Sequence, residues 1–363
     1  MPVALLALLS LPVPPPPSEG QRTDVVAFKA TDVSCADGPV AAGAILTPFS
    51  AISTRYAAAG GMTAPTHRLT FVIDAQGHAR TIRREPAPSA GWFVDTSDLA
   101  PALAASQFPV GAPRTGCSVR FTVSTEPLEA AAMPVLYELA SRPETIGYPA
   151  ALFERVRPMG SNCPRQPGQY RRLNMPPFET LPRSPGGPAW VFLAFDVDTA
   201  GKPGNVRVLG TSGNAALDRA GREALLANRY APGGGYRGCT YHFFLNGGAD
   251  HPAPDLGPDS PADTGDQPGC VIDPRSIRSL LDGSAYPRPA WRRRIEGVAV
   301  IAYDTAPWGA VGNPKILTSE PDDSFGNTAR NILSNAQTTP SDTGRRGCVQ
   351  RVRFKLPADG VVR

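Results

Sequence analysis

The chain has 363 residues, of which 41% are hydrophobic and 19% charged, a balance that suits two or three folded domains and argues against a disordered chain. Its formal net charge of +4 is small for this length, so the composition favours neither nucleic-acid binding nor adsorption to a membrane through charge. The 41 prolines and 36 glycines predict short elements joined by long irregular connections.

Residues 1–20 are typical of a secretion signal. The apolar run Val3–Leu9 has the length of the hydrophobic part of such a signal and is too short to span a bilayer. The signal lacks two usual features, because no Lys or Arg precedes Arg22 and no clear cleavage site follows, so a buried N-terminal segment is the alternative. No later segment is apolar enough to cross a membrane.

Residues 24–124 are predicted to form a first unit, made of a β-hairpin, a helix and a final strand. These elements are marked, in that order, by Leu69–Ile73 with Asp74 and Gly77, by Leu99, Ala102 and Leu103, and by Cys117 with Phe121 and Val123. The alternation after Cys117 predicts one buried strand face, with the sulfur pointing into the core. Residues 125–160 form a connector, with a helix expected around Val135–Ala140.

Residues 161–247 repeat this order in a second unit. Its elements are marked by Val191–Phe195 with Asp196 and Gly201, by Asn214, Leu217, Ala220, Ala224 and Leu225, and by Cys239 with Phe243 and Leu245. Asn214 is expected to cap the helix, and Pro232 to end it. Residues 248–268, rich in Pro, Gly and Asp, contain too little apolar surface to fold and are expected to be a solvated linker. Limited proteolysis should cut there and release a fragment from about Gly269.

Residues 269–358 form the third unit, which begins with a short helix signal between Asp273 and Gly283. Its elements are marked by Val298–Tyr303 with Asp304 and a delayed Gly309, by Phe325, Thr328, Ile332 and Leu333, and by Cys348 with Val352, Phe354 and Leu356. The fold class is therefore α+β. We expect three tandem small units, each an antiparallel sheet with a helix packed on one face.

The cysteines recur with the units. The two cysteines of each unit are 82, 76 and 78 residues apart, with an aligned aspartate between them. Six cysteines allow fifteen pairings, and the recurrence selects Cys35–Cys117, Cys163–Cys239 and Cys270–Cys348. Redox-active pairs usually lie close together in sequence. Structural disulfides in an oxidising compartment are therefore expected.

The third unit resembles the C-terminal domain family of TonB. The residues that carry the resemblance are Tyr286-Pro287-Arg288-Pro289-Ala290 and Gly297, which precede the hairpin, the helix with small residues and the last strand. The second unit keeps the later elements but opens with Met175-Pro176-Pro177-Phe178, and the first unit diverges most. Tyr148-Pro149-Ala150-Ala151 also resembles the opening motif, but no hairpin follows it, so we treat it as a chance match.

The resemblance implies a periplasmic or secreted protein of the Gram-negative envelope that touches outer-membrane transporters. In that family a transporter peptide adds as a strand to the sheet edge, so that backbone hydrogen bonds supply the affinity. We expect the chain to depart from the energy-transducing members, because the apolar run within residues 1–20 does not have the length of a membrane anchor and Pro14–Pro17 is a poor substitute for their long proline-rich spanner. The expected partner is thus a protein or extended peptide of the envelope.

No catalytic, metal-binding or cofactor-binding motif stands out. The histidines His67, His78, His242 and His251 are scattered, which argues against a metal site. Gly210-Thr211-Ser212-Gly213 only loosely resembles a catalytic serine turn, and Gly233-Gly234-Gly235 follows a helix rather than preceding one. Arg292-Arg293-Arg294 is either a contact for an anionic partner or a solvated turn before a strand.

The last strand offers a candidate binding edge, in which Arg351, Arg353 and Lys355 alternate with the inward residues. Charges on an edge discourage indiscriminate pairing but admit an acidic extended peptide. The leading hypothesis is therefore a non-enzymatic peptide-binding protein of TonB-type transport systems. The alternatives are a structural or assembly protein without a free edge, and an enzyme whose residues are not recognisable.

Overall fold

The computed structural model describes residues 21–40, 45–56, 66–86, 94–143, 148–164, 170–184, 187–247, 250–257, 269–277 and 285–356. The signal-like segment 1–20, with Pro14–Pro17, lies outside these ranges, as do residues 258–268 of the expected linker. Among the helices within them, none combines the length and the apolar character needed to cross a membrane.

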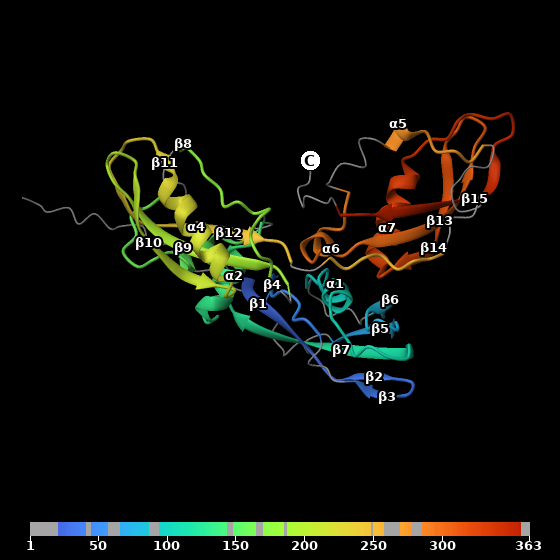
Figure 1. The fold of residues 1–363 in the computed structure, drawn as a ribbon, viewed down its shortest axis with the longest axis horizontal. Helices are drawn as coiled ribbons and strands as arrows, with labels where there is room; N and C mark the ends of the chain where they lie inside the picture. The colour runs from blue at the N-terminus through green and yellow to red at the C-terminus, as the bar shows by residue number, and fades with distance from the viewer. Residues whose placement is uncertain are drawn as a thin grey trace, which may run out of the picture.

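Three parts of the chain have the same order of hairpin, helix and strand (Figure 1). In the first unit the elements are β5 (Thr66–Ile73), β6 (Ala79–Arg84), α1 (Leu99–Ala104) and β7 (Arg114–Pro127). In the second they are β9 (Ala189–Val197), β10 (Pro203–Thr211), α4 (Ala215–Ala227) and β12 (Tyr236–Leu245). In the third they are β13 (Gly297–Thr305), β14 (Val311–Glu320), α7 (Asp323–Ser334) and β15 (Arg345–Phe354).

The second and third units have three-stranded antiparallel sheets, in the orders β10-β9-β12 and β14-β13-β15. Two short strands, β8 (Tyr170–Arg172) and β11 (Arg229–Tyr230), pair beside the second unit's sheet. Asn214 caps α4 as expected, because its side chain accepts a hydrogen bond from the Leu217 N–H at 3.0 Å. The inward positions expected on α4 are all buried.

The first unit is larger than the small sheet we expected. Four additional strands, β1 (Gln21–Ala30), β2 (Val33–Cys35), β3 (Gly38–Val40) and β4 (Ala51–Tyr56), join β5, β6 and β7 in a seven-stranded sheet. Both β1 and β2 pair with β7, whose other side pairs with β5. The segment before the hairpin was expected only to carry the first cysteine. Its alternating residues instead form strands because β7 is long enough to offer them a second edge.

The three hairpins turn in the same way. In each, the turn glycine has a positive φ and its carbonyl oxygen accepts a hydrogen bond from the segment after the helix, the pairs being Phe108–Gly77 at 2.8 Å, Tyr230–Gly201 at 2.9 Å and Thr338–Gly309 at 2.8 Å. A side chain could not replace these glycines, because a Cβ at each would lie 2.2 Å from a backbone oxygen. The glycine of the third hairpin is thus not delayed.

This shared turn corrects the alignment of the aspartates. Asp74 occupies the place of Asp198, since the carboxylate of each accepts N–H groups of its own turn. Asp196 and Asp304 share a different place, where their carboxylates accept the N–H groups of Gly238 and Gly347 at 2.9 and 3.1 Å. The sequence alignment of Asp74 with Asp196 and Asp304 was wrong by two residues, because the turn is fixed by its glycine.

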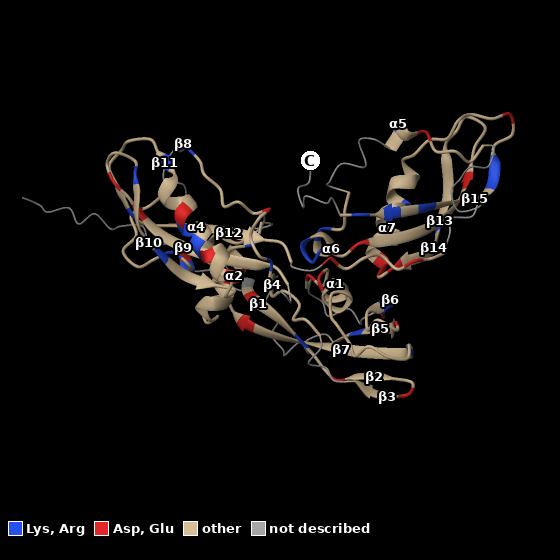
Figure 2. Ribbon diagram, viewed as in Figure 1, with Lys and Arg blue, Asp and Glu red and all other residues tan. Residues whose placement is uncertain are grey.

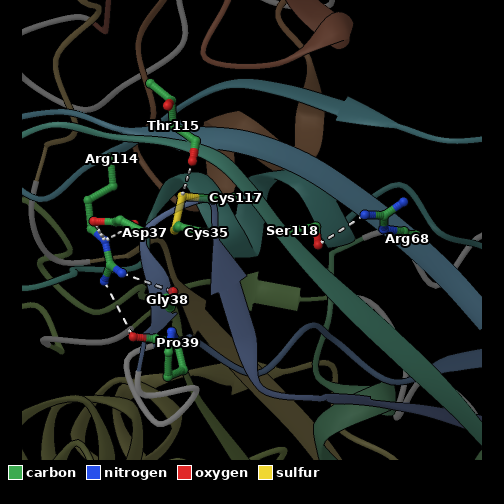
Figure 3. The surroundings of a disulfide bond; sticks show 9 residues. All are labelled: Cys35, Asp37, Gly38, Pro39, Arg68, Arg114, Thr115, Cys117 and Ser118. Atoms are coloured by element: carbon green, nitrogen blue, oxygen red, sulfur yellow. Dashed lines mark hydrogen bonds and ion pairs between the residues drawn. A yellow bond between two sulfur atoms is a disulfide. The ribbon is translucent and has the colours of Figure 1, made fainter.

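The six cysteines are bonded in the expected pairs, Cys35–Cys117, Cys163–Cys239 and Cys270–Cys348. Figure 3 shows the first of them beside the β2–β3 turn, where Arg114 pairs with Asp37 at 2.9 Å and donates to the carbonyl oxygen of Gly38. Each disulfide ties the segment that leads into a unit to that unit's last strand, a cross-link that restricts the unfolded chain.

The connector packs the first two units together. It contains the expected helix, α2 (Met133–Ala140), and a second, α3 (Ala150–Arg155), which begins just after Tyr148-Pro149. Leu136 and Leu139 are fully buried in a cluster with Val25 of β1 and with Trp190 and Phe192 of β9. The helix α2 therefore covers the face of the second sheet opposite α4.

The first and third units share one hydrophobic core although a whole unit separates them in sequence. Arg293 is 3% exposed and forms a buried ion pair with Asp98 of the first unit at 2.6 Å. Glu320 accepts hydrogen bonds from the N–H and hydroxyl of Thr81 at 2.7 and 2.6 Å. In Figure 1, α1 and β6 lie beside the third unit, to which Asp98 and Arg83 are hydrogen-bonded.

Two expectations fail at this junction. Arg293 and Arg294 belong neither to a solvated turn nor to an exposed contact, because both are buried and paired, with Asp98 and Asp250. Residues 250–257 of the expected linker are not solvated throughout, because they lie against the third unit. Their partners come from distant parts of the sequence, which local composition does not reveal.

Candidate peptide-binding edge of the third unit

Strand β15 lies at the edge of the third unit's sheet. It pairs with β13 from Gly297↔Phe354 to Thr305↔Arg345, and in the described part of the chain no other strand pairs with it. No strand of the described ranges therefore occupies the far side of β15, where an extended segment would pair in strand addition.

The two faces of β15 differ as the alternation predicts. Cys348 and Phe354 are buried toward α7, together with Ala299 and Ile301 of β13. Arg351 and Arg353 lie opposite Val300 and Val298 on the other face. Figure 2 shows the basic residues along this strand. The candidate residues Arg351, Arg353 and Lys355 thus project from one face of an edge strand.

Their exposure is less uniform than we expected. Arg353 and Lys355 are exposed, whereas Arg351 is half-buried and donates a hydrogen bond to the Gly257 carbonyl oxygen at 2.9 Å. Val352 and Leu356, expected to be buried, are only half-buried, whereas Phe354 between them is buried. The basic face is therefore partly covered by the chain itself.

A groove of about 280 Å³ runs along this basic face. One wall consists of Arg351, Arg353 and Lys355 with Glu296 and Val298, and the other of residues 252–256. Three cationic side chains against the single carboxylate of Glu296 give the β15 wall a positive field, which favours acidic ligands. We call this feature the basic groove.

Hydrogen bonds hold residues 250–257 beside the groove. The His251 N–H donates to the Arg294 carbonyl oxygen and the Glu296 N–H to the His251 carbonyl oxygen, both at 2.8 Å. Arg80 of the first unit donates to the Pro252 carbonyl oxygen at 3.3 Å. The segment is thus anchored to the third unit and touches the first.

Two ionisable groups of the segment respond to this environment. The hydrogen bond from Arg294 is the main reason why the pKa of Asp250 lies below its usual value. Burial, aided by the charges of His78, Arg80 and Arg293, lowers the pKa of His251 to about 4, although Asp250 opposes this shift. The environment of the docked segment therefore favours a neutral His251 and an ionised Asp250.

The motif residues Tyr286, Pro287, Ala290 and Gly297 lie behind the edge and support it. The Tyr286 hydroxyl donates to the Ile295 carbonyl oxygen at 2.6 Å, and its ring contacts Phe354 with a centroid distance of 5.9 Å. Pro287 precedes α6 (Arg288–Arg292), and Ala290 is fully buried. Gly297 lets the Phe325 ring approach, because a Cβ there would lie 2.2 Å from that ring.

Residues 282–358 match the family model of the Gram-negative bacterial TonB protein C-terminal. The match includes β13, β14, α7, β15 and every residue of the candidate edge and of the opening motif. It begins after Cys270 and covers neither of the first two units. A comparison with characterised proteins found no match to the chain.

The last strands of the other units lie in different surroundings. β12 pairs only with β9 among the strands that the structure describes, but its neighbours include α2 and α3 and it carries no charge between Cys239 and Leu245. β7 is paired on both sides, with β5 and with β1 and β2. Among the described last strands, β15 alone combines a single strand neighbour with a row of basic residues.

The serine of the turn that loosely resembles a catalytic motif makes a backbone contact. The Ser212 hydroxyl accepts the Trp190 N–H at 2.9 Å, which holds the turn between β10 and α4. Within the ranges that the structure describes, no three His, Cys, Asp or Glu side chains converge on a point where a metal ion could bind.

Sequence reasoning missed the segment 250–257 and the junction arginines. A signal for the segment was present, since Asp250 and Asp255 sit among prolines in a chain that carries a basic strand. Composition alone favoured a linker, because Arg351 and Arg80, which donate to this segment, are 94 and 172 residues away in sequence from the residues they bind.

Proposed function

We propose that the chain is a non-enzymatic protein of the Gram-negative envelope, periplasmic or secreted, that binds extended segments of envelope proteins by strand addition at β15. The observation that carries the proposal is a basic edge strand within residues 282–358, which match the TonB C-terminal family. Strand addition draws its affinity from backbone hydrogen bonds, and the side chains of the edge select the partner.

The chemistry of the edge favours an acidic partner. A strand that pairs with β15 would place alternate side chains beside Arg351, Arg353 and Lys355, where an Asp or Glu contributes roughly 0.2–1 kcal/mol per opposite pair. The family match supports a partner in TonB-type transport, such as an outer-membrane transporter. The three disulfides support an oxidising compartment.

We further propose that the first two units are diverged copies of the third. The support is geometric: the same turn hydrogen bonds, positive-φ residues at Thr81, Asn205 and Asn313 four residues after the turn glycine, and a disulfide to the last strand of each unit. Such a set of shared irregularities is hard to explain by convergence, because each of them is individually unfavourable or uncommon.

An assembly role without peptide capture is the second candidate. It is favoured by the joined core of the first and third units and by the burial of α2 against the second sheet. In that case the molecule would be a rigid spacer, and β15 would have no partner outside the chain.

The test is capture of envelope proteins by the purified, oxidised chain, with bound proteins identified by mass spectrometry. The wild type is compared with Arg353→Glu and with Arg120→Glu, a matched control on the exposed face of β7, where strand addition is blocked. Strand addition at β15 predicts that Arg353→Glu loses partners that Arg120→Glu retains, while both melt close to the wild type. Equal capture by all three proteins would leave the assembly role as the better explanation.

A further inference from the structure

Residues 250–257 cover the basic groove and carry acidic residues, which the positive field of the groove favours. Asp255 lies among the groove residues, and Asp250 pairs with Arg294 at one end. The segment is anchored beside Ile295 at His251 and contacts Arg351, opposite Val300, at Gly257. It therefore runs nearly extended, in the same direction as β13.

The groove also suits prolines. The bonds that hold the middle and the end of the segment are donated by the guanidinium groups of Arg80 and Arg351 to backbone carbonyl oxygens of Pro252 and Gly257. Proline has a carbonyl oxygen but no N–H. Pro252 and Pro254 therefore bring no backbone donor that needs an acceptor into a site where the protein supplies the donors, the arginine side chains. The segment therefore places Asp250 on Arg294 and Asp255 in the positive field of the groove, where the Asp255 carboxylate accepts the Gly257 N–H at 2.9 Å, and it offers carbonyl oxygens to guanidinium donors.

We propose that residues 250–257 are an internal ligand, and that the partner of the third unit is an acidic, proline-containing extended segment that must displace them. This rests on the proposed function, because a strand that pairs with β15 would lay its side chains on the basic face that residues 250–257 cover. It adds the partner's composition and a competition within the chain. A partner placed between the segment and β15 would bring its carboxylates next to Asp255, and like charges disfavour that arrangement. Replacement of the segment avoids the repulsion, and a carbonyl oxygen of the partner takes the place of the Gly257 oxygen at Arg351.

Competition lowers the apparent affinity of the intact chain. A tethered segment acts at an effective concentration in the millimolar range, and the affinity for an external ligand falls with the fraction of molecules whose groove is open. Weakening the docked segment should therefore tighten the binding of an external peptide.

The experiment uses a fluorescent peptide with the sequence of residues 250–257 and the oxidised full-length chain. The release variant carries Pro252→Gly, Pro254→Gly and Leu256→Ser, which raise the entropy of the undocked segment and remove an apolar contact of the groove. We expect the release variant to bind the peptide about tenfold more tightly than the wild type, because more of its grooves are open. Adding Arg351→Glu to the release variant should abolish this gain, and near-ultraviolet circular dichroism checks that each variant is folded.

A control peptide with both aspartates replaced by lysine should bind neither protein. If the release variant binds the peptide more weakly than the wild type, the segment is part of the binding site; if the two bind equally, the segment does not compete. Either result overturns the inference but leaves the strand-addition proposal standing. Loss of peptide binding in both proteins, together with no partner captured through Arg353, would overturn both.

Discussion

β7 and β15 hold the same position in their units, yet among the described strands β7 has neighbours on both sides and β15 on one. The first unit closes its edge with β1, whose residues Asp24–Ala30 run antiparallel to Phe121–Pro127. The outer face of β15 carries two arginines and a lysine, whereas the equivalent face of β7 carries Arg120 with threonine and serine.

The hairpin–helix–strand architecture can therefore accept a further strand beside its last strand without rearrangement. β1 is an internal example, because it adds to β7 at the place where a partner strand would add to β15. An edge closed by the chain contributes to stability, and a charged edge left open is protected from indiscriminate pairing while it stays available to a selected partner. The predictions below test this contrast, beginning with the junction that joins the two units.

The largest effect is expected from Asp98→Ala. Asp98 accepts hydrogen bonds from Arg293 and from the Phe49 N–H at 2.7 Å, and its loss leaves a buried guanidinium without its carboxylate. Breaking a buried pair from one side costs about 3–5 kcal/mol. Chemical denaturation of the oxidised protein measures this loss, and Asp255→Ala, which removes an exposed carboxylate, is the control that should change little.

The next largest effect concerns the closing strand. Phe28 of β1 is 6% exposed and lies opposite Val123 of β7, so Phe28→Ala should cost about 3 kcal/mol through the cavity that it leaves. Hydrogen exchange should then rise in residues 121–127 of β7 and stay unchanged in β15. Equal acceleration in both strands would show that the two edges are not independent.

The disulfide of the third unit gives a smaller effect. Cys270→Ser combined with Cys348→Ser releases the segment before β13 from the open-edge strand and should cost about 2–3 kcal/mol. Denaturation of the double variant measures this cost. Cys35→Ser combined with Cys117→Ser should raise hydrogen exchange in β7 less than the first pair of changes raises it in β15, because β1 and β5 still flank β7. A larger rise in β7 than in β15 would contradict the contrast between the two edges.

Much of the hairpin–helix–strand order was predictable because it depends on local patterns. The buried side of α4, its Asn214 cap and the inward positions Phe121 and Val123 follow from periodicity and capping chemistry. The disulfide pairs followed from recurrence and not from any single unit. The aspartate alignment failed because a carboxylate can accept backbone N–H groups at two places in the hairpin. Only the turn glycine is sterically required, so it alone fixes the alignment.

The rest depends on contacts between residues far apart in the sequence. Arg293 lies in a run of three arginines that suggests solvent, and only the position of Asp98 in the first unit explains its burial. β1 is a strand because it pairs with the second edge of β7. Residues 250–257 are held by Arg80 of the first unit and by Arg351 of β15, which donate hydrogen bonds to their carbonyl oxygens. The basic strand itself was predictable from alternation, but its partial cover was not.

The smallest effect is local and depends on pH. His251 faces His78 and Arg80 from the first unit and Arg293 from the end of α6, with Asp250 beside it, and burial is the main cause that lowers its pKa to about 4. Because the folded value lies below the ordinary value of about 6.5, docking of residues 250–257 is fully stabilised above pH 6.5 and weakens as the pH falls toward 4.

Hydrogen exchange of residues 250–257, corrected for the intrinsic rate, should therefore show less protection at pH 5 than at pH 7.5, with little change in the melting temperature of the whole protein. His251→Gln carries no titrating ring and should show the same protection at both values. If the wild type and His251→Gln respond alike to pH, protonation of this histidine does not release the segment. If only the wild type responds, acidification opens the basic groove of the third unit and leaves the closed edge of the first unit unchanged.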